Sequence, residues 1–510
     1  MNINYSEIWY TYSTYFSGNQ LVPLSIISEI LLRTNITDCI YTNEGNYRIL
    51  SGDKVIEKEI DTEYNPEMTR GSFSIKDWPE NDFTKEVLYQ NCINSFFERK
   101  LLNYDGKYVD NSYIRFSVGE AVLLFEHDDK ILYPFITVYP TGILILEFRG
   151  IYNKSYGIDD YIDNCVDFSR KVYSKCYTSK QLSKLSRNII NWTGECSEII
   201  EDSGEFKFEL FEFIVGEKHR TLTTIATTMF EIIITLMNHV LKKSSLEIGN
   251  IWIHKPHIHL LKYTNQKKLA SECVEMNSKE LKKILLDISR SYEDYIETYE
   301  LKNLRKFNDF ARFYASNLTL TVWSKDGIKN ETTSFDPNFN HCVYHSEVTD
   351  RFLDYINMLY EQSFNYINNC MSYDQLLYHQ TSHYLLENDL MHISKYGEIE
   401  DMISYAKSVL RIEEKANNAL NLLELKKSEI DFAKNKQITV FSYVITFIFG
   451  IISTGALSND LITPLYKYLG LPAINNCYLE NLLMWGISFS AILVSVFIAY
   501  HLIIRNKKKI

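Results

Sequence analysis

Several sequence signatures are absent from this chain of 510 residues, and each absence weighs against a class of function. The Gly-x-x-x-x-Gly-Lys-Ser/Thr loop and the Gly-x-Gly-x-x-Gly turn, which hold nucleotide phosphates, do not occur, and only 19 glycines are present. The His-Glu-x-x-His motif of zinc proteases is missing as well. Catalysis therefore has no positive support in the sequence, and we expect that the protein is not an enzyme.

Cysteine pairs and basic runs are also scarce. The nine cysteines are scattered singly, with no Cys-x-x-Cys pair, which fits free thiols in a reducing compartment better than a disulfide framework. The formal net charge is −12, and no long basic run lies outside the C-terminus, so direct nucleic-acid binding is not expected. The first residues lack the basic and apolar regions of a secretory signal peptide. We therefore expect the large N-terminal part to stay in the cytoplasm.

Two long apolar stretches near the C-terminus are the most informative feature that is present. Residues 438–457 and 482–504 contain no Asp, Glu, Lys or Arg. At about 1.5 Å per residue, each helix can cross a hydrocarbon core about 30 Å thick. Lysines precede the first stretch and basic residues follow the second, whereas the loop between them carries little positive charge. The pattern predicts a hairpin in the inner cell membrane with both termini in the cytoplasm. The alternative is a pair of buried helices in a soluble domain.

A third apolar stretch, residues 221–241, is interpreted differently. Glu231 lies at its centre, and charged residues lie close on both sides. A glutamate at mid-membrane costs a few kcal/mol on insertion scales. We therefore expect a buried helix of the soluble domain and not a third span.

The remaining sequence predicts a fold class: an α+β cytoplasmic domain, a long helical stalk and a C-terminal two-helix hairpin, assembled as a symmetric oligomer. Alternation of apolar and polar residues between about 40 and 150 predicts strands, for example at 54–60, 113–118, 121–126 and 142–149. Further along, we expect helices at 157–173 and 180–191, a strand at 206–214, charged solvated helices at 275–314, a strand or helix end at 318–323 and a polar loop at 325–340. The predicted domains are a sensor (1–265), charged helices and a linker (266–345), the stalk (346–436) and the membrane part (437–510).

An approximate heptad precedes the first apolar stretch, at Ile399, Met402, Ala406, Val409, Ala416, Leu420, Leu423 and Ile430. Neither Pro nor Gly occurs in residues 398–449, so we expect one helix to run straight into the first span, over about 60 residues or about 90 Å. A seam of this length needs partner helices, most simply other copies of the chain around an axis. A helix packed within its own chain is the alternative, and the pattern alone does not separate the two.

Small and polar residues of the first span share one helical face, because they recur at intervals of three or four: Thr439, Ser442, Thr446, Gly450, Ser453 and Ala456. Such a stripe either packs closely against another helix or faces water in a pore. The second span has its own small residues at Ala491, Ser495 and Ala499, which are sufficient for packing. We therefore favour the pore for the first stripe.

This order of parts resembles the CorA family of divalent-cation channels. The resemblance implies a homo-oligomer, a pentamer in that family, whose first span lines the pore, with a divalent cation as permeant or regulatory ion. The family's Gly-Met-Asn signature is not present, because Gly455 is followed by Ala456 and Leu457. Mg²⁺ selectivity is therefore not implied, although Asn459 and Asp460 could present oxygens at the outer mouth.

The basic tail of the chain also matches the resemblance. In the family, basic residues form a collar around the stalk at the membrane, and the matching residues here are Arg505, Lys507, Lys508 and Lys509. Plain topogenic charges in contact with lipid headgroups are the alternative.

The enlarged N-terminal domain and the degenerate signature resemble one branch of CorA-like proteins. Members of that branch are membrane effectors of type III CRISPR antiviral defence and are opened by a nucleotide second messenger, an S-adenosylmethionine–AMP conjugate in part of the family. The resemblance implies a small nucleotide-type ligand, but no residue indicates where it binds. The alternatives are a Mg²⁺ transporter, a membrane-anchored sensor or scaffold without a pore, and an anchored enzyme.

Histidines supply the best metal candidate. His254, His257 and His259 lie within six residues, and the last two share a face if the segment is extended. Three histidines so close in sequence rarely complete a tetrahedral site, and only one acidic or thiol ligand could join them from a distance. We therefore expect a partly exposed strand edge without a metal. His379 and His383 lie one helical turn apart, but Gln380 stands where a zinc protease needs Glu.

Overall fold

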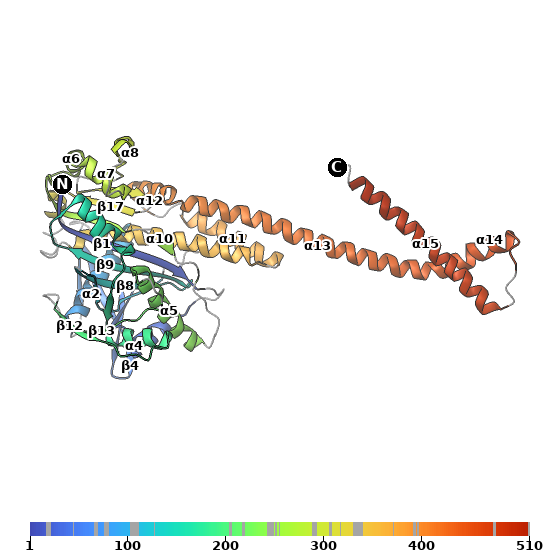
Figure 1. Cartoon of the computed structure of the whole chain (residues 1–510), viewed down its shortest axis with the longest axis horizontal. Coiled ribbons are helices and arrows are strands. Elements are labelled where there is room, and N and C mark those ends of the chain that lie inside the picture. The colour runs from blue at the N-terminus through green and yellow to red at the C-terminus, as the bar shows by residue number, and fades with distance from the viewer. Residues whose placement is uncertain are drawn as a thin grey trace. The chain divides into compact units, whose positions relative to one another are not determined.

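The computed structural model contains an N-terminal α+β domain with a mixed sheet, followed by long helices (Figure 1). It describes the chain except residues 17–21, 44, 66–69, 76–80, 102–111, 127, 203–206, 217–219, 242–248, 250–251, 254–255, 288–292, 305–308, 317, 330–339, 371, 391–393, 395–396, 473–475 and 508–510. The chain divides into two compact units. The first comprises residues 1–369 and 377–422, and the second comprises residues 370–376 and 423–510.

A mixed sheet forms the centre of the first unit. From one edge its strands follow in the order β16 (Phe310–Ala315), β17 (Leu318–Trp323), β15 (His257–Tyr263), β1 (Asn2–Tyr15), β9 (Ile143–Tyr152) and β8 (Asp129–Val138). Strands β15 and β17 pair in parallel, and the other neighbours in this order are antiparallel.

Beyond β8 the sheet divides, because one part of β8 pairs with β6 (Ile114–Ser117) and another with β7 (Ala121–Leu124). The first branch continues through β2 (Cys39–Thr42), β3 (Asn46–Ser51) and β4 (Lys54–Asn65) to β5 (Arg70–Ile75). The second continues through β11 (Lys175–Thr178) and β13 (Lys207–Glu212) to β12 (Glu198–Asp202). Two short strands, β10 (Tyr156–Gly157) and β14 (Trp252–Ile253), pair with the ends of β1.

One face of this sheet is apolar and is covered by helices. Ile8, Tyr10 and Tyr12 of β1 point into the larger core, because alternate residues of a strand share a face. Helix α5 (Leu222–Leu241) packs there with nine fully buried apolar side chains: Leu222, Ile225, Ala226, Met229, Phe230, Ile232, Ile233, Ile234 and Met237. The prediction that residues 221–241 form a buried helix is confirmed. Each large apolar side chain buried in this way contributes about 1.5–3 kcal/mol to folding.

Smaller helices complete the first unit. They are α1 (Leu24–Arg33), α3 (Ile158–Tyr161), a π-helical turn η1 (Ile162–Val166), a 3₁₀ turn η2 (Asp167–Arg170), α4 (Lys180–Ile189), α6 (Ala270–Met276), α7 (Ser278–Leu286) and α8 (Glu293–Thr298). The helix predicted at 180–191 is therefore confirmed. The one predicted at 157–173 is a series of three short helical turns.

The opposite face of the sheet is covered by α10 (Asn340–Asn368) and α2 (Asp82–Leu101). Tyr15 of β1 and Ile145 of β9 share a second core with Phe352 and Tyr355 of α10. The rest of this face is rich in buried charge. It includes Glu7, Arg115, Glu147, Arg149 and Arg312, each at most 4% exposed.

Six predicted strands are present in the structure. They are 54–60 (β4), 113–118 (β6), 121–126 (β7), 142–149 (β9), 206–214 (β13) and 318–323 (β17). The prediction of charged helices over residues 275–314 is wrong at its C-terminal end, because Phe310–Ala315 forms strand β16. The reason is that Arg312 is buried against Asp350 and does not face solvent.

A domain boundary at residue 265 would separate β16 and β17 from β15, with which β17 pairs. In the predicted polar loop, residues 325–329 are helical and 330–339 lie outside the described residues.

The predicted uninterrupted stalk helix is broken at Arg411. Helix α12 (Gly397–Val409) ends before it, and α13 (Ile412–Leu457) begins after it. Arg411 has a φ of 58°, in the left-handed region, where a side chain crowds the backbone and costs about 1–2 kcal/mol. The absence of Gly and Pro was therefore not sufficient to predict a continuous helix.

The first half of the heptad packs within its own chain. Ile399, Met402 and Ala406 are buried in the second core of the first unit, together with Ala416, whereas Leu420 is exposed. The own-chain alternative therefore holds for the part of the heptad from Ile399 to Ala416.

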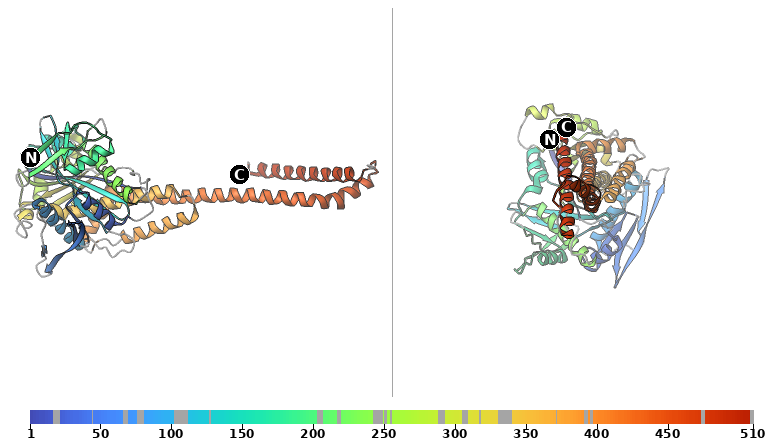
Figure 2. Two further views of the ribbon diagram at one scale, coloured as in Figure 1. Left: turned by 90° about the horizontal axis from the view of Figure 1, so that it is seen from below. Right: turned by 90° about the vertical axis from the view of Figure 1, so that its right-hand side faces the viewer.

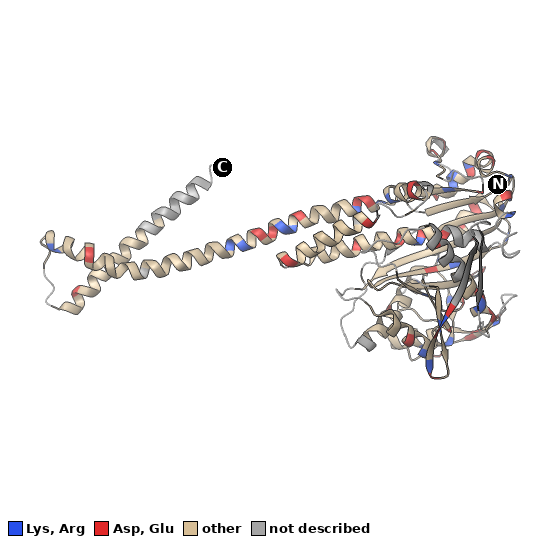
Figure 3. Ribbon diagram, turned by 180° about the vertical axis from the view of Figure 1, so that it is seen from behind, with Lys and Arg blue, Asp and Glu red and all other residues tan. Residues whose placement is uncertain are grey.

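The second unit contains the two apolar helices. Helix α13 is followed by a π-helical turn η3 (Ser458–Ile462), by α14 (Thr463–Tyr468) and by α15 (Cys477–Lys507), so that α13 and α15 form a hairpin (Figure 2). The last charged residue of α13 is Lys436, after which its ribbon shows no charge (Figure 3). Both helices are long and apolar enough to cross a membrane. Helix α11 (Tyr373–Leu390) precedes α12.

A buried carboxyl near the branch of the sheet gives a testable pH effect. Glu120, between β6 and β7, is 1% exposed, and burial together with the Glu201 carboxylate raises its pKa from 4.5 to about 7, against the opposing effect of the Tyr133 hydroxyl. Because the pKa is higher in the folded state, stability is lost as the pH rises from about 4.5 through 7. We expect Glu120→Gln to stabilise the protein by roughly 2–3 kcal/mol at pH 8 and hardly at all at pH 4.5.

Thermal unfolding of the full-length protein at the two pH values measures this effect. The matched control is Glu126→Gln, because Glu126 is exposed in the turn between β7 and β8. A gain of equal size at both pH values would contradict the assignment.

Candidate functional site

Two histidines and three carboxylates meet between the sheet and α10. His257 and His259 are two residues apart on β15 and therefore point to the same face. Glu347, Asp350 and Asp354 are spaced by three and four residues on α10 and therefore share a helical face. With Arg312 of β16, we call these residues the His257 cluster. All six side chains are at most 2% exposed.

The two imidazoles converge on one carboxylate. His257 Nδ1 lies 2.8 Å from Glu347 Oε2, and His259 Nε2 lies 2.6 Å from Glu347 Oε1. His257 Nδ1 is also 3.6 Å from Asp350 Oδ2, and on the other side of the ring Nε2 is 3.8 Å from Asp354 Oδ2. Arg312 donates a hydrogen bond to Asp350. Each nitrogen of His257 thus faces a carboxylate.

Burial and opposite charge act against each other in this cluster. Burial alone would lower the pKa of His257, but Glu347 and Asp350 outweigh it and raise that pKa from 6.5 to about 10. Burial would raise the pKa of Glu347, but His257 holds it far below its usual value. Burial raises the pKa of Asp354 well above its usual value despite the opposing charge of His257. The cluster can therefore hold a cation, either as protons or as a metal ion.

The structure changes the interpretation of the histidines. We expected a partly exposed strand edge, but His257 and His259 are each 1% exposed, in the interior of the first unit. His254 lies outside the described residues. The carboxylates of α10, which follow the histidines by about 90 residues in the chain, were not among the predicted site residues. Their spacing on a helix was the available signal.

Further buried ion pairs lie beside the cluster on the same face. Arg149 donates two hydrogen bonds to Glu7, at 2.8 and 3.0 Å. Arg115 is 2.8 Å and Arg351 3.4 Å from Glu147 Oε2. These pairs join β1, β6 and β9 to one another and to α10. They leave this interface unusually polar for the interior of a domain.

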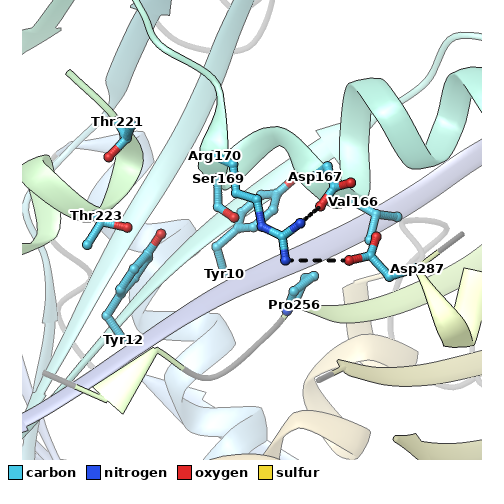
Figure 4. Close-up of a pocket in the computed structure, with 10 residues that line it drawn as sticks. All are labelled: Tyr10, Tyr12, Val166, Asp167, Ser169, Arg170, Thr221, Thr223, Pro256 and Asp287. Atoms are coloured by element: carbon cyan, nitrogen blue, oxygen red, sulfur yellow. Dashed lines mark ion pairs between the residues drawn. The ribbon is translucent and has the colours of Figure 1, made fainter. Parts of the chain in front are cut away.

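A pocket of about 480 Å³ opens on the other face of β1 (Figure 4). Tyr10 and Tyr12 line it from the strand, with Thr221 and Thr223 from the start of α5. Tyr10 hydrogen-bonds Tyr152 at 2.6 Å and donates to the carbonyl of Cys165.

A charged group lies at the rim of this pocket. Arg170 projects between Asp167, at 3.0 Å, and Asp287, at 3.7 Å (Figure 4). Its side chain is 61% exposed, so it is accessible to a ligand. The sequence did not indicate this pocket, because its residues come from β1, η2, α5 and the end of α7.

The predicted stripe of the first span lies beside the face on which the hairpin packs. Thr439, Ser442, Thr446, Ser453 and Ala456 are exposed in the chain. Burial falls instead on Thr454 and Ser458 of α13 and η3, and on Met484 and Ser488 of α15.

Gly450 lies both on the predicted stripe of small and polar residues and on the face of α13 that packs against α15. A Cβ atom added there would lie 3.7 Å from Ile492 of α15, so Gly450 continues the packing face formed by Thr454 and Ser458. On α15, the residues in this contact are Met484, Ser488 and Ile492, whereas Ala491 of the predicted packing stripe is exposed. The structure does not describe the side chains of Ser495 and Ala499. The hydroxyl residues of the stripe are thus not used by the packing of their own hairpin.

The remaining predicted site residues lie at the two ends of the hairpin. Asn459 and Asp460 are exposed in the π-helical turn η3, and Gly455 is half-buried just before it. Arg505 and Lys507 belong to the end of α15, with side chains outside the description, and Lys508 and Lys509 lie outside the described residues.

No protein-family model matches this chain, and searches of curated proteins and of solved structures find no match either. Function must therefore be inferred from the sequence and the geometry.

Proposed function

We propose that this chain is one subunit of a homo-oligomeric membrane ion channel whose large α+β domain controls opening. The observation that supports this most is the exposed stripe of α13. Close packing in lipid uses small and hydroxyl residues at the helix–helix contact, and Gly450, Thr454, Ser458 and Ser488 supply them in this hairpin. Thr446 and Ser453 are additional to that contact and are exposed in the single chain, as are all residues from 431 to 449.

Helix α13 offers a path from the domain to the membrane. It begins at Ile412, which is fully buried in the second core of the first unit, and continues without interruption to Leu457. A change at its first turn can therefore be passed to the apolar stretch along one continuous helix. Coupling of this kind requires that the ligand bind one state better than the other.

The finer proposal follows the CorA resemblance: a pentamer that opens when a nucleotide second messenger, such as an S-adenosylmethionine–AMP conjugate, binds during antiviral defence. The pocket beside β1 has the size of typical ligand sites, which are about 300–1,000 Å³. Arg170 offers a guanidinium to a phosphate, and Tyr12, Thr221 and Thr223 offer hydroxyls. Moving a channel from 1% to 99% open requires about 5.5 kcal/mol of differential binding, which several subunits can share.

If the S-adenosylmethionine–AMP conjugate is the ligand, Arg170→Ala should weaken its binding. We expect at least tenfold weaker binding of the conjugate, about 1.4 kcal/mol, because a charge-assisted contact to phosphate is removed. Calorimetric titration of the full-length protein in detergent measures it. Lys154→Ala is the matched control, since Lys154 is 69% exposed and does not line the pocket. Equal affinity in both variants would exclude this pocket, and flat titrations of the wild type would exclude the messenger.

Reconstitution of the full-length protein in liposomes tests the channel itself. We expect ion flux and an oligomer of defined size in detergent. Flux of Mg²⁺ alone, without dependence on a ligand, would favour a divalent-cation transporter. A monomer without flux would favour a membrane-anchored sensor or scaffold and would end the proposal.

A further inference from the structure

We propose that the His257 cluster binds one divalent first-row transition-metal ion, with His257 Nδ1, His259 Nε2, Glu347 and Asp350 as ligands. The ligand atoms of His257, Glu347 and Asp350 all lie within 4.8 Å of one another, and all three side chains are buried. The inference concerns the soluble domain alone and does not depend on the channel.

The spacing of the donor atoms is close to what a metal requires. Bonds of about 2.0–2.2 Å from a tetrahedral metal place its ligand atoms about 3.3–3.6 Å apart. His257 Nδ1 and Asp350 Oδ2 already have this separation, at 3.6 Å. The contacts from Glu347 to the two imidazoles, at 2.8 and 2.6 Å, are hydrogen-bond distances that need to open by less than about 1 Å. The closest set of donors is His257, Glu347 and Asp350, and His259 joins it through its contact with Glu347.

The surroundings of the donor set resemble the outer shell of a metal site. A histidine that binds a metal through one ring nitrogen usually donates the other N–H to a carboxylate. In His257, Nδ1 faces Glu347 and Asp350, and Nε2 faces the Asp354 carboxyl at 3.8 Å, a contact longer than a hydrogen bond. Arg312 donates a hydrogen bond to Asp350 Oδ2, and Asp350 Oδ1 is buried without a hydrogen bond within the described residues.

The net charge of the cluster is also compatible with a bound divalent metal ion. Three carboxylates and one guanidinium give the cluster a charge of −2 when both imidazoles are neutral. Without a metal, neutrality requires two protons, which His257 and the buried Asp354 can hold because the pKa of each is raised. One divalent cation neutralises the cluster and leaves both imidazoles as neutral lone-pair donors.

The donor types limit the identity of the ion. Imidazole nitrogens are ligands for Zn²⁺, Fe²⁺, Mn²⁺ or Co²⁺, whereas Mg²⁺ and Ca²⁺ prefer oxygen alone. The ligands of this site therefore differ from those of a pore that conducts Mg²⁺ or Ca²⁺. Because its ligands come from β15 and α10, a bound metal would link the polar face of the sheet to the helix that covers it.

The metal content of the full-length protein tests this inference. Protein produced with added zinc, manganese, iron and cobalt salts and purified in detergent should retain close to one metal ion per chain by elemental mass spectrometry. We expect His257→Ala and Glu347→Gln to retain less than a tenth of this amount. His379→Ala should retain all of it, because His379 lies on α11, outside the cluster. Co²⁺-loaded wild-type protein should show visible absorption typical of nitrogen coordination, and His257→Ala should not.

A milder variant keeps the test decisive if the ligand variants do not fold. Asp354→Asn preserves the four ligands and removes only the outer carboxylate, and it should weaken metal affinity about 10- to 100-fold. Wild-type protein without stoichiometric metal and without the Co²⁺ absorption would overturn the inference and show that the cluster is a protonated ion-pair network. Metal content unchanged in His257→Ala, or metal affinity unchanged in Asp354→Asn, would also overturn it.

Discussion

Replacing Thr446 by Leu should reduce ion flux through the reconstituted protein at least tenfold. Thr446 lies near the middle of the exposed stripe on α13, and in a symmetric oligomer every subunit carries the substitution. A ring of leucines narrows the path and replaces hydroxyls with apolar surface, which favours dewetting of the pore. Ser453→Leu, two turns further along the same stripe, should act in the same way. Single-channel recording and liposome flux measure both effects.

The control for this prediction is Ile448→Leu. Ile448 is 50% exposed on the side of α13 opposite to the stripe, where the proposal places lipid, so the change should leave flux within twofold of the wild type. A second measurement uses Ser453→Cys in a background in which Cys477, which is exposed, is changed to Ser. A water-soluble thiol reagent should then block the flux. If Thr446→Leu and Ile448→Leu have the same effect, the stripe does not line a conducting path.

The sequence predicted best those parts of the fold that depend on runs of apolar residues. Helix α5 and the two apolar helices of the hairpin were predicted because burial or lipid requires continuous hydrophobicity over one or more faces. Thr454 shows the limit of this reasoning. It was not included in the packing face, yet it is fully buried in the second unit, with its hydroxyl donated to the Gly450 carbonyl at 2.7 Å. A hydroxyl satisfied by its own helix behaves as a small packing residue.

The charged sheet face was the hardest part to predict. Alternation of polar and apolar residues along β9 and β16 is typical of strands with one solvated face, but here α10 covers the polar face. Arg312 was placed in the charged, solvated helices predicted over residues 275–314, although it is paired with Asp350 in the interior. The partners in the His257 cluster are about 90 residues apart in the chain, so no local pattern could join them. Their pairing depends on tertiary structure alone.

Breaking one of these buried ion pairs should have the largest effect on stability. Arg149→Ala removes both hydrogen bonds to Glu7, whose side chain is completely buried, and leaves a carboxylate without its cation. The cost of an uncompensated buried charge is about 3–5 kcal/mol in unfolding free energy. The Arg149 guanidinium also lies 5.9 Å from the Trp9 ring, so tryptophan fluorescence should report the change. Thermal and chemical unfolding of the full-length protein measure the loss.

The double variant Glu7→Gln/Arg149→Met separates the lost charge pair from the lost packing. Because it removes both charges and keeps similar side-chain volume, it should recover most of the stability that Arg149→Ala loses. Arg33→Ala is the surface control. It breaks an exposed pair with Glu29, at 48% and 51% exposure, and should cost less than about 1 kcal/mol. If Arg149→Ala were as mild as Arg33→Ala, or if the double variant were no more stable than Arg149→Ala, Glu7 and Arg149 would not depend on each other. The polar interface between sheet and α10 would then be maintained by its other pairs.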